Sequence, residues 1–223
     1  MHRFNQALCA AATLSVLATA AQAATVTFGP ILFDNGGLDY TAGSNGSFSM
    51  PQFDPGLGTL LSVTVEVTGN SFGGSNALDN QSAQAGEASV TIGSNIFVTG
   101  PSSLLILTQP SETNSGPVAA DDGGPIDFIG PDAISVVGTS STDTDSDLLT
   151  TSLSPYIGLG SVIFNFSSFV NTANSATVSP TFSTTSPPSF NFTATVTYEY
   201  IPEPTGLSLL ALGALPMVRR RRA

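Results

Sequence analysis

Three aspartates stand at every second position of one stretch, in the order Asp143, Asp145 and Asp147. Calcium-binding loops of the EF-hand type space their first three carboxylate ligands in this way, and calcium prefers oxygen ligands. The rest of such a loop is missing, because Leu148 stands in place of the turn glycine and Ser154 in place of the closing glutamate. The triplet is therefore a candidate calcium site, and the alternative is an acidic loop that simply faces solvent.

Other acidic and aromatic residues allow three further candidate sites. Asp121, Asp122 and Asp127 could form a second, less regular calcium site. A glycosidase needs two carboxylates roughly 5–10 Å apart in a cleft, but nothing in the spacing selects a pair, and Trp, which is common in sugar clefts, is absent. Four tyrosines could stack on sugar rings, although tyrosines in strands are more often buried or half-buried; they are Tyr40, Tyr156, Tyr198 and Tyr200.

The middle of the chain lacks several chemically important residue types. Residues 24–200 contain no Lys, Arg, His, Cys or Trp, but they contain all the acidic residues except Glu203. Without imidazole or thiol, serine- and cysteine-hydrolase triads and zinc sites are excluded. Without basic residues, phosphoryl transfer and nucleic-acid binding lose their usual electrostatic support. We expect a protein that is not an enzyme and has no cofactor except possible calcium, and whose fold depends on apolar burial and backbone hydrogen bonds.

The amino terminus has the layout of a secretory signal peptide. A basic start is followed by the apolar residues 7–21, and Ala21 and Ala23 are small residues at positions −3 and −1 of a cleavage site. The alternative, a buried helix, does not explain this order of features. We expect signal peptidase to cut after Ala23, which leaves Ala24 as the first residue of the mature protein.

The carboxyl terminus carries a second segment directed to the membrane. Pro202, Glu203 and Pro204 precede an apolar run, residues 205–218, which as a helix would be roughly 21 Å long. That is short for a bilayer core of about 30 Å, so transient retention fits better than a permanent span or a terminal core helix. The basic residues that end the run would stay on the cytoplasmic side; they are Arg219, Arg220, Arg221 and Arg222.

This tripeptide, apolar run and basic end together resemble the PEP-CTERM sorting signal of bacterial exported proteins. The resemblance covers only residues 201–223. It implies recognition by an exosortase, a membrane-embedded cysteine protease that removes the apolar helix. It also implies transient association with the inner membrane, followed by location at the cell surface or outside the cell.

The residues between the two signals predict many short strands. Alternation over residues 61–69, 161–169 and 190–200 predicts three strands with one buried face each. Residues 88–92 and 96–98 predict a hairpin across 93–95, and residues 126–129 and 134–137 predict two short strands. We expect residues 70–84 to form a loop, and 108–125 and 139–154 to be polar connecting segments.

These patterns predict an all-β fold, an antiparallel β-sandwich of jelly-roll or immunoglobulin-like type. The N-terminal signal helix and the C-terminal short hydrophobic helix would flank it. The expected parts are the signal peptide at 1–23, the sandwich at 24–200 and the sorting signal at 201–223.

Residues 53–60 and 62–65, together with the final strand at 196–200, resemble the choice-of-anchor E domain of bacterial exported proteins. That family supplies no catalytic residues. We therefore expect a non-enzymatic component of the cell surface or of an extracellular polysaccharide matrix, with polysaccharide as a possible partner. The alternative is a calcium-dependent carbohydrate-binding module.

Overall fold

In the computed structural model the described residues are 22–203, and Ala23–Glu203 form one compact unit. The regular secondary structure of this unit is almost entirely strands that pair antiparallel in three open sheets, which confirms the expected all-β class. The signal peptide and the hydrophobic tail fall on residues 1–21 and 204–223, outside the described residues. Within 22–203, no helix combines the length and the apolar composition that crossing a bilayer requires.

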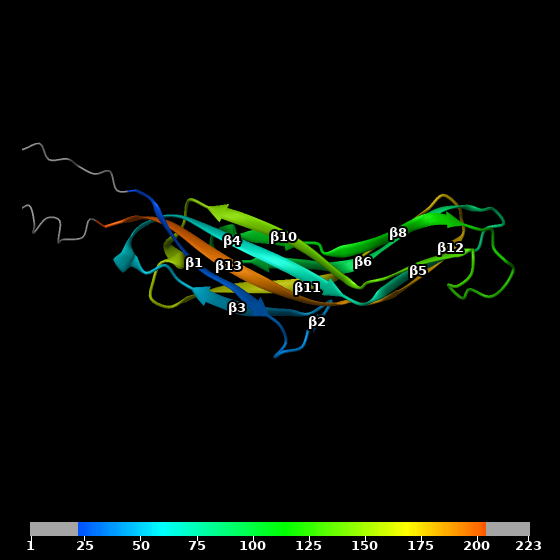
Figure 1. Ribbon diagram of the computed structural model, residues 1–223, viewed down its shortest axis with the longest axis horizontal. Coiled ribbons are helices and arrows are strands. Elements are labelled where there is room, and N and C mark those ends of the chain that lie inside the picture. The colour runs from blue at the N-terminus through cyan, green and yellow to red at the C-terminus, as the bar shows by residue number, and fades with distance from the viewer. Residues whose placement is uncertain (1–21, 204–223) are drawn as a thin grey trace, which may run out of the picture. The chain divides into compact units, whose positions relative to one another are not determined.

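Sheets 1, 2 and 3 contain all the long strands (Figure 1). Sheet 1 has the order β1 (Ala24–Phe33), β13 (Ser189–Pro202), β4 (Gly58–Phe72) and β10 (Ser140–Leu149), with the short β2 (Tyr40–Thr41) also on β13. Sheet 2 has the order β3 (Asn45–Pro51), β11 (Ser161–Ala176), β6 (Gly86–Thr99) and β7 (Leu105–Thr108), and β8 (Ser111–Val118) also pairs with β6. Sheet 3 has the order β12 (Thr181–Ser186), β5 (Ser75–Asn80) and β9 (Ala133–Val137). Three single 3-10 turns complete the elements of residues 22–203: η1 (Pro55–Leu57), η2 (Pro101–Ser103) and η3 (Ser154–Tyr156).

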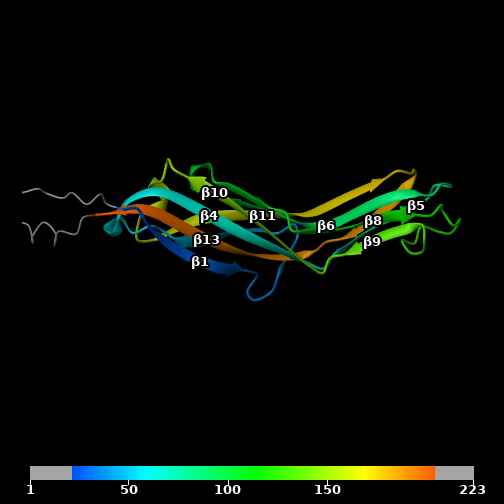
Figure 2. The same ribbon diagram turned by 45° about the horizontal axis from the view of Figure 1, so that its top comes forward.

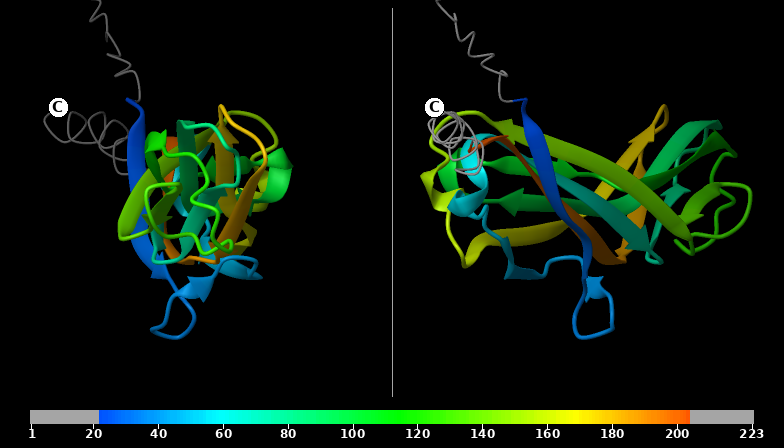
Figure 3. Two further views of the ribbon diagram at one scale, coloured as in Figure 1. Left: turned by 90° about the vertical axis from the view of Figure 1, so that its right-hand side faces the viewer. Right: turned by 60° about the vertical axis from the view of Figure 1, so that its left-hand side comes forward.

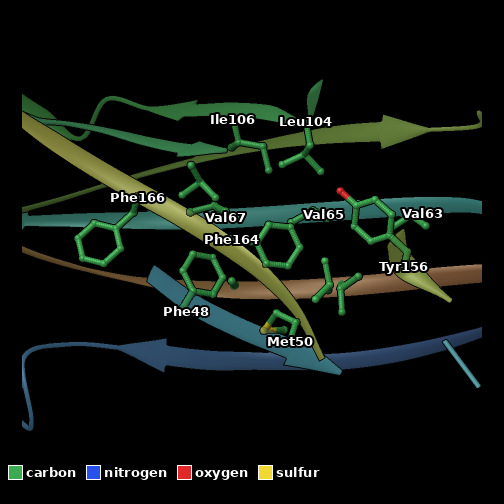
Figure 4. Close-up of a cluster of buried hydrophobic side chains, with 14 of the residues drawn as sticks. Phe48, Met50, Val63, Val65, Val67, Leu104, Ile106, Tyr156, Phe164 and Phe166 are labelled. Carbon is green, nitrogen blue, oxygen red and sulfur yellow. The ribbon is translucent and has the colours of Figure 1, made fainter. Parts of the chain in front are cut away.

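Sheets 1 and 2 pack face to face around an aromatic core (Figure 4). The predicted inner face of β4 is fully buried, because Val63, Val65 and Val67 are each 0% exposed. Phe164 and Phe166 of β11 lie opposite them, and further phenylalanines fill the space between the sheets. Period-two alternation therefore predicts this core correctly. At the outer edge of sheet 1, β1, blue in Figure 3, pairs with β13.

Sheet 3 packs on β8 and on the other halves of β6 and β11, around a second, small core. In the described part of the chain this core holds aliphatic side chains and no aromatic ring; its buried members are Leu78, Ala88, Val90, Ile92, Val118, Ile134 and Val136. Polar residues are buried beside it, among them Asn76, Asp79 and Asn80. Strands β6 and β11 run through both cores, so sheet 2 is continuous from one core to the other (Figure 2).

Sheet 3 continues sheet 1 across a line of breaks. Three strands of sheet 1 each lead into one strand of sheet 3, and the order β13-β4-β10 becomes β12-β5-β9. On one side of the line Phe72 pairs with Ser140 and Ser189, and on the other Ser75 pairs with Val137 and Ser186. The connections are Gly73-Gly74, Gly138-Thr139 and Pro187-Pro188.

These connecting residues explain the breaks. Gly73 and Gly74 have φ angles of 61° and 72°, which favour glycine, and proline lacks the N–H that a ladder needs. Glu112 of β8 holds the Gly138-Thr139 connection, because its Oε1 accepts hydrogen bonds from the N–H of Thr139 and of Ser140, both at 2.9 Å.

The expected hairpin across 93–95 is wrong, because β6 is one strand from Gly86 to Thr99. Gly93 has no positive φ angle. A side chain there would collide with Pro110 and Ser111, so this glycine permits close packing of the β7–β8 connection and does not form a turn. Ser94 is buried and its hydroxyl lies 3.1 Å from that of Ser71.

Four other segment predictions are wrong, and three of them missed strands that are rich in polar side chains. Residues 70–84 contain the end of β4 and all of β5, 108–125 contain β8, and 139–154 contain β10, whereas 126–129 lie in a loop. Strand β5 lies in the middle of sheet 3 and buries asparagine and aspartate, so it lacks an apolar pattern. Strands β8 and β10 carry mostly polar residues, so apolar alternation does not predict them.

Candidate functional site

The strand triplet, Asp143, Asp145 and Asp147, lies on β10 at an edge of sheet 1. Same-face residues of a strand are roughly 7 Å apart, and the three carboxylates are not among the side chains that converge on one point. The calcium prediction for this triplet stays a prediction. The structure offers the three carboxylates different partners.

Those partners are backbone N–H groups of the opposite sheet. Asp147 Oδ2 accepts from the N–H of Leu105 at 3.2 Å, and Asp145 Oδ2 accepts from the N–H of Leu107 at 3.1 Å. Asp143 Oδ2 accepts from the N–H of Gln109 at 2.7 Å. These donors belong to β7 and to the residue just after it. Side chains on one face of β10 and outward N–H groups of β7 share a two-residue period, so the triplet covers the free edge of sheet 2.

A second set of carboxylates does converge. Carboxylate oxygens of Asp121, Asp122 and Asp132, here called the loop cluster, all lie within 4.8 Å of one another. The cluster belongs to residues 119–132, the green loop that joins β8 to β9 at the right of Figure 1. A structureless connection of this length is uncommon in a compact domain and often has a function.

Hydrogen bonds within the loop use only one oxygen of each carboxylate. Asp121 Oδ1 accepts from the N–H of Gly123 at 3.0 Å, and Asp122 Oδ1 accepts from the N–H of Gly124 at 2.7 Å. The N–H of Asp122 in turn donates to Asp132 Oδ2 at 3.2 Å. One oxygen of each carboxylate is thus held in place by the backbone, and the other is left for a further partner.

Asp132 is the unusual member of the cluster. Its side chain is only 3% exposed, and its Oδ1 is buried with no hydrogen-bond partner among the described residues. Buried carboxylate oxygens are normally paired, because an unpaired one loses its hydration without compensation.

Two buried residues of β5 anchor the loop. Asn80 donates its amide N–H to the carbonyl oxygen of Ala119 at 2.5 Å, and its backbone N–H donates to the carbonyl oxygen of Asp132 at 2.9 Å. Asp79 Oδ2 accepts from the N–H groups of Asp127 and Phe128 at 3.2 and 3.1 Å.

The Asp79 carboxyl group is stabilised in its charged form. Burial by itself would raise its pKa, but hydrogen bonds from the Gln81 side chain and from the N–H groups of Phe128 and Asp127 outweigh burial. Together they hold the pKa of Asp79 below its ordinary value of 3.8. The loop is therefore tied to sheet 3 by an ionised, buried carboxylate.

Sequence reasoning found Asp121 and Asp122 but paired them with Asp127, which is exposed and accepts from the N–H of Ile129. It missed Asp132. A signal was present, because Asp132 shares the parity of Ile134 and Val136, which face the small core. Extending that alternation backwards by one step places Asp132 on the buried side.

Two of the four tyrosines are unavailable for stacking on sugars. Tyr156 and Tyr198 are 0% exposed, and their hydroxyls donate to the carbonyl oxygens of Pro101 at 2.9 Å and Pro51 at 2.7 Å. Burial, assisted by the nearby charge of Asp147, raises the pKa of Tyr156 to about 12. Both side chains are structural members of the aromatic core.

An open hollow lies on the part of sheet 2 formed by β6, β8 and β11. It is lined by small side chains, among them Ser89, Ser115 and Ser175, with the single carboxylate of Glu87. A glycosidase needs two carboxylates in its cleft, and this hollow offers one.

The residues expected at the processing sites fall partly outside the described residues. Ala21, Pro204 and the arginines at 219–222 lie outside them. Ala24 pairs with Tyr200 at one end of sheet 1, and Pro202 pairs with Gly58 at the same end. The first residue after the expected signal-peptidase cut and the first residue of the sorting tripeptide therefore lie on neighbouring strands.

Comparisons with known proteins do not place this chain in a family. No protein-family model matches the chain, and a comparison with curated proteins finds no match. Solved structures that match include several of infectious bursal disease virus. The Gt strain structure is 14% identical, with 96% of this chain and 53% of that chain covered and a TM-score of 0.13. The VP2 subviral particle of the same virus is 12% identical, with 89% of this chain and 50% of that chain covered and a TM-score of 0.14. The chain spans about half the length of these structures, and TM-scores this low support no inference about fold or function.

Proposed function

We propose that this chain is an exported, non-enzymatic component of the cell surface or of an extracellular polysaccharide matrix, sorted by an exosortase. Its body is an antiparallel β-sandwich of jelly-roll or immunoglobulin-like type, related to the choice-of-anchor E domain. Signal peptidase and the exosortase are its partners during export, and extracellular polysaccharide is its partner afterwards.

One observation carries the proposal: both expected processing sites adjoin the same end of sheet 1. Ala24 begins β1 and Pro202 ends β13, and these two strands pair with each other. A domain whose two membrane-directed segments begin at one end can approach the membrane by that end during export. The remaining surface is free of Lys, Arg and His between residues 24 and 200, so the acidic body is repelled by anionic lipid and remains in solution.

Mass spectrometry of the mature protein from its native host tests this proposal. We expect a chain that begins at Ala24 and ends before residue 205, recovered from the cell surface or the medium. A chain that keeps Arg219 to Arg222 and remains in the inner membrane contradicts the proposal. Deleting those four arginines supplies the matched control, because it leaves residues 24–203 unchanged and removes only the retention signal.

The carbohydrate-binding alternative makes a different prediction. Binding of a glycan on an array, abolished by EDTA, favours a calcium-dependent module over a passive matrix component. Because Tyr156 and Tyr198 are buried, stacking on a sugar ring could use only the half-buried Tyr40 or Tyr200 among the four tyrosines.

A further inference from the structure

The loop cluster presents a charge problem that the protein alone does not solve. Three carboxylates have oxygens within 4.8 Å of one another, and like charges at that distance repel strongly when they are shielded from water. Residues 24–200 contain no Lys, Arg or His, so the described part of the chain has no side chain to neutralise them.

Asp132 makes the problem acute. Its side chain is 97% buried, as its 3% exposure shows, and its Oδ1 has no partner among residues 22–203. Water satisfies an exposed acidic cluster, but it reaches this oxygen poorly. A side chain that has a buried carboxylate oxygen without a hydrogen bond, and that lies within 4.8 Å of two more carboxylates, is suited to a cation.

We propose that Asp121, Asp122 and Asp132 bind one calcium ion, which joins the 119–132 loop to the end of the small core. The ligand set is oxygen only, which favours a hard cation over zinc. The ligands come from an irregular loop, which suits the flexible coordination of calcium at six to eight oxygens better than the strict octahedron of magnesium. Water completes the shell on the side of Asp122, the exposed member of the cluster.

The site has a clear mechanical role. Asp132 lies directly before β9 and Asp121 lies shortly after β8, so the ion links the two ends of the loop. The carbonyl oxygen of Asp132 also accepts from the N–H of Asn80 at 2.9 Å. Calcium bound here stabilises sheet 3 against β8, where the apolar core is small.

Calorimetric titration and thermal melting of the purified full-length protein test the proposal, with CaCl2 compared against EDTA. We expect one bound calcium with a dissociation constant on the order of 10⁻⁴–10⁻³ M, the range of the weaker protein calcium sites. At a calcium concentration 100-fold above that constant, the melting temperature should rise by about 5–10 °C. MgCl2 should bind at least tenfold more weakly.

Three variants locate the ion. Asp132→Asn keeps an acceptor for the N–H of Asp122 but removes a charge, so we expect at least a tenfold loss of calcium affinity. In EDTA the same variant should melt at or above the temperature of the parent protein, because repulsion within the cluster is relieved. Asp127→Asn, in the same loop, and Asp145→Asn, in the strand triplet, should bind calcium like the parent. If Asp132→Asn does not fold, Asp121→Asn takes its place with the same expectation.

Several results would overturn the proposal. One is that the parent protein shows neither a heat of calcium binding nor a calcium-dependent rise in melting temperature. Another is equal binding of magnesium. A third is loss of binding in Asp127→Asn or Asp145→Asn while Asp132→Asn still binds. None of these results depends on export or sorting, so the proposed function is tested separately.

Discussion

The two cores of this protein are stabilised in different ways. Around the aromatic core, phenylalanines such as Phe192 pack ring against ring, and the nearby acidic residues of β10 lie at the edge of the sandwich. Around the small core, aliphatic side chains are few, and buried polar groups such as Asn80 and Asp79 hold the loops through hydrogen bonds. Where less apolar surface can be buried, polar contacts must supply more of the stability.

The two sets of three aspartates show the same contrast. On a strand, alternate side chains stand roughly 7 Å apart and each finds its own N–H donor. In the 119–132 loop they converge within 4.8 Å and leave oxygens unpaired. The same residue type therefore closes a sheet edge in one place and forms a candidate cation site in the other, and backbone geometry makes the difference.

Truncation of the aromatic core should have the largest effect. Phe192 is fully buried, with ring centroids of Phe33, Phe48 and Phe166 within 5.4 Å. We expect Phe192→Ala to lower the free energy of unfolding by about 3–5 kcal/mol. Val90→Ala, in the small core, removes less buried surface and should cost roughly 2 kcal/mol. Urea denaturation measures both, and a larger loss for Val90→Ala would contradict the contrast between the cores.

Removal of the buried carboxylate of Asp79 should have the next largest effect. Asp79→Ala leaves the N–H groups of Asp127 and Phe128 without an acceptor, and we expect a loss of about 3 kcal/mol. Asp79→Asn keeps an acceptor oxygen and should lose about 1 kcal/mol.

The pH dependence of stability should also report the hydrogen bonds that the Asp79 carboxylate accepts. The folded-state pKa of Asp79 is lowered from 3.8 and that of Glu112 from 4.5. Burial opposes the shift of Glu112, and hydrogen bonds from Thr139 and Ser140 outweigh it. A carboxyl with a lowered pKa stabilises the fold fully above its unfolded pKa, and this stabilisation is lost as pH falls through the folded value. Stability should therefore decline below about pH 4.5, and Asp79→Asn should decline less than the parent. An identical pH dependence in both proteins would contradict this account.

Uncovering the edge of β7 should have the smallest effect on stability. Asp145→Ala removes the acceptor for the N–H of Leu107 at an accessible edge, so we expect a loss of about 1 kcal/mol. Amide exchange resolves the effect residue by residue. Exchange at Leu107 should accelerate, while Leu105 and Gln109, which keep Asp147 and Asp143, serve as internal controls. Unchanged exchange at Leu107 would show that the carboxylate does not cover the edge.

Sequence alone predicts the parts of the fold where apolar residues alternate. The inner faces of β4, β11 and β13 follow from alternation, because each has one face on the aromatic core and one in solvent. Strand β5 could not be found in this way, since both its faces are covered and it buries Asn76 and Asp79.

For the candidate site, the sequence shows that aspartates are present but not which of them lie close together in space. Asp121 and Asp122 are adjacent and easily found, yet their partner Asp132 is separated from them by a loop whose path no pattern fixes. Similarly, the spacing of the β10 triplet is equally compatible with calcium ligands and with an edge cover. Only the position of β7 beside β10 reveals the N–H donors.

Crystals grown in CaCl2, with anomalous diffraction recorded at a long wavelength, test most directly whether the two sets of aspartates differ in role. We predict one calcium peak, with oxygens of Asp121, Asp122 and Asp132 at about 2.3–2.6 Å, and no peak along Asp143, Asp145 and Asp147. A peak on β10, or none at the loop cluster, would contradict this account.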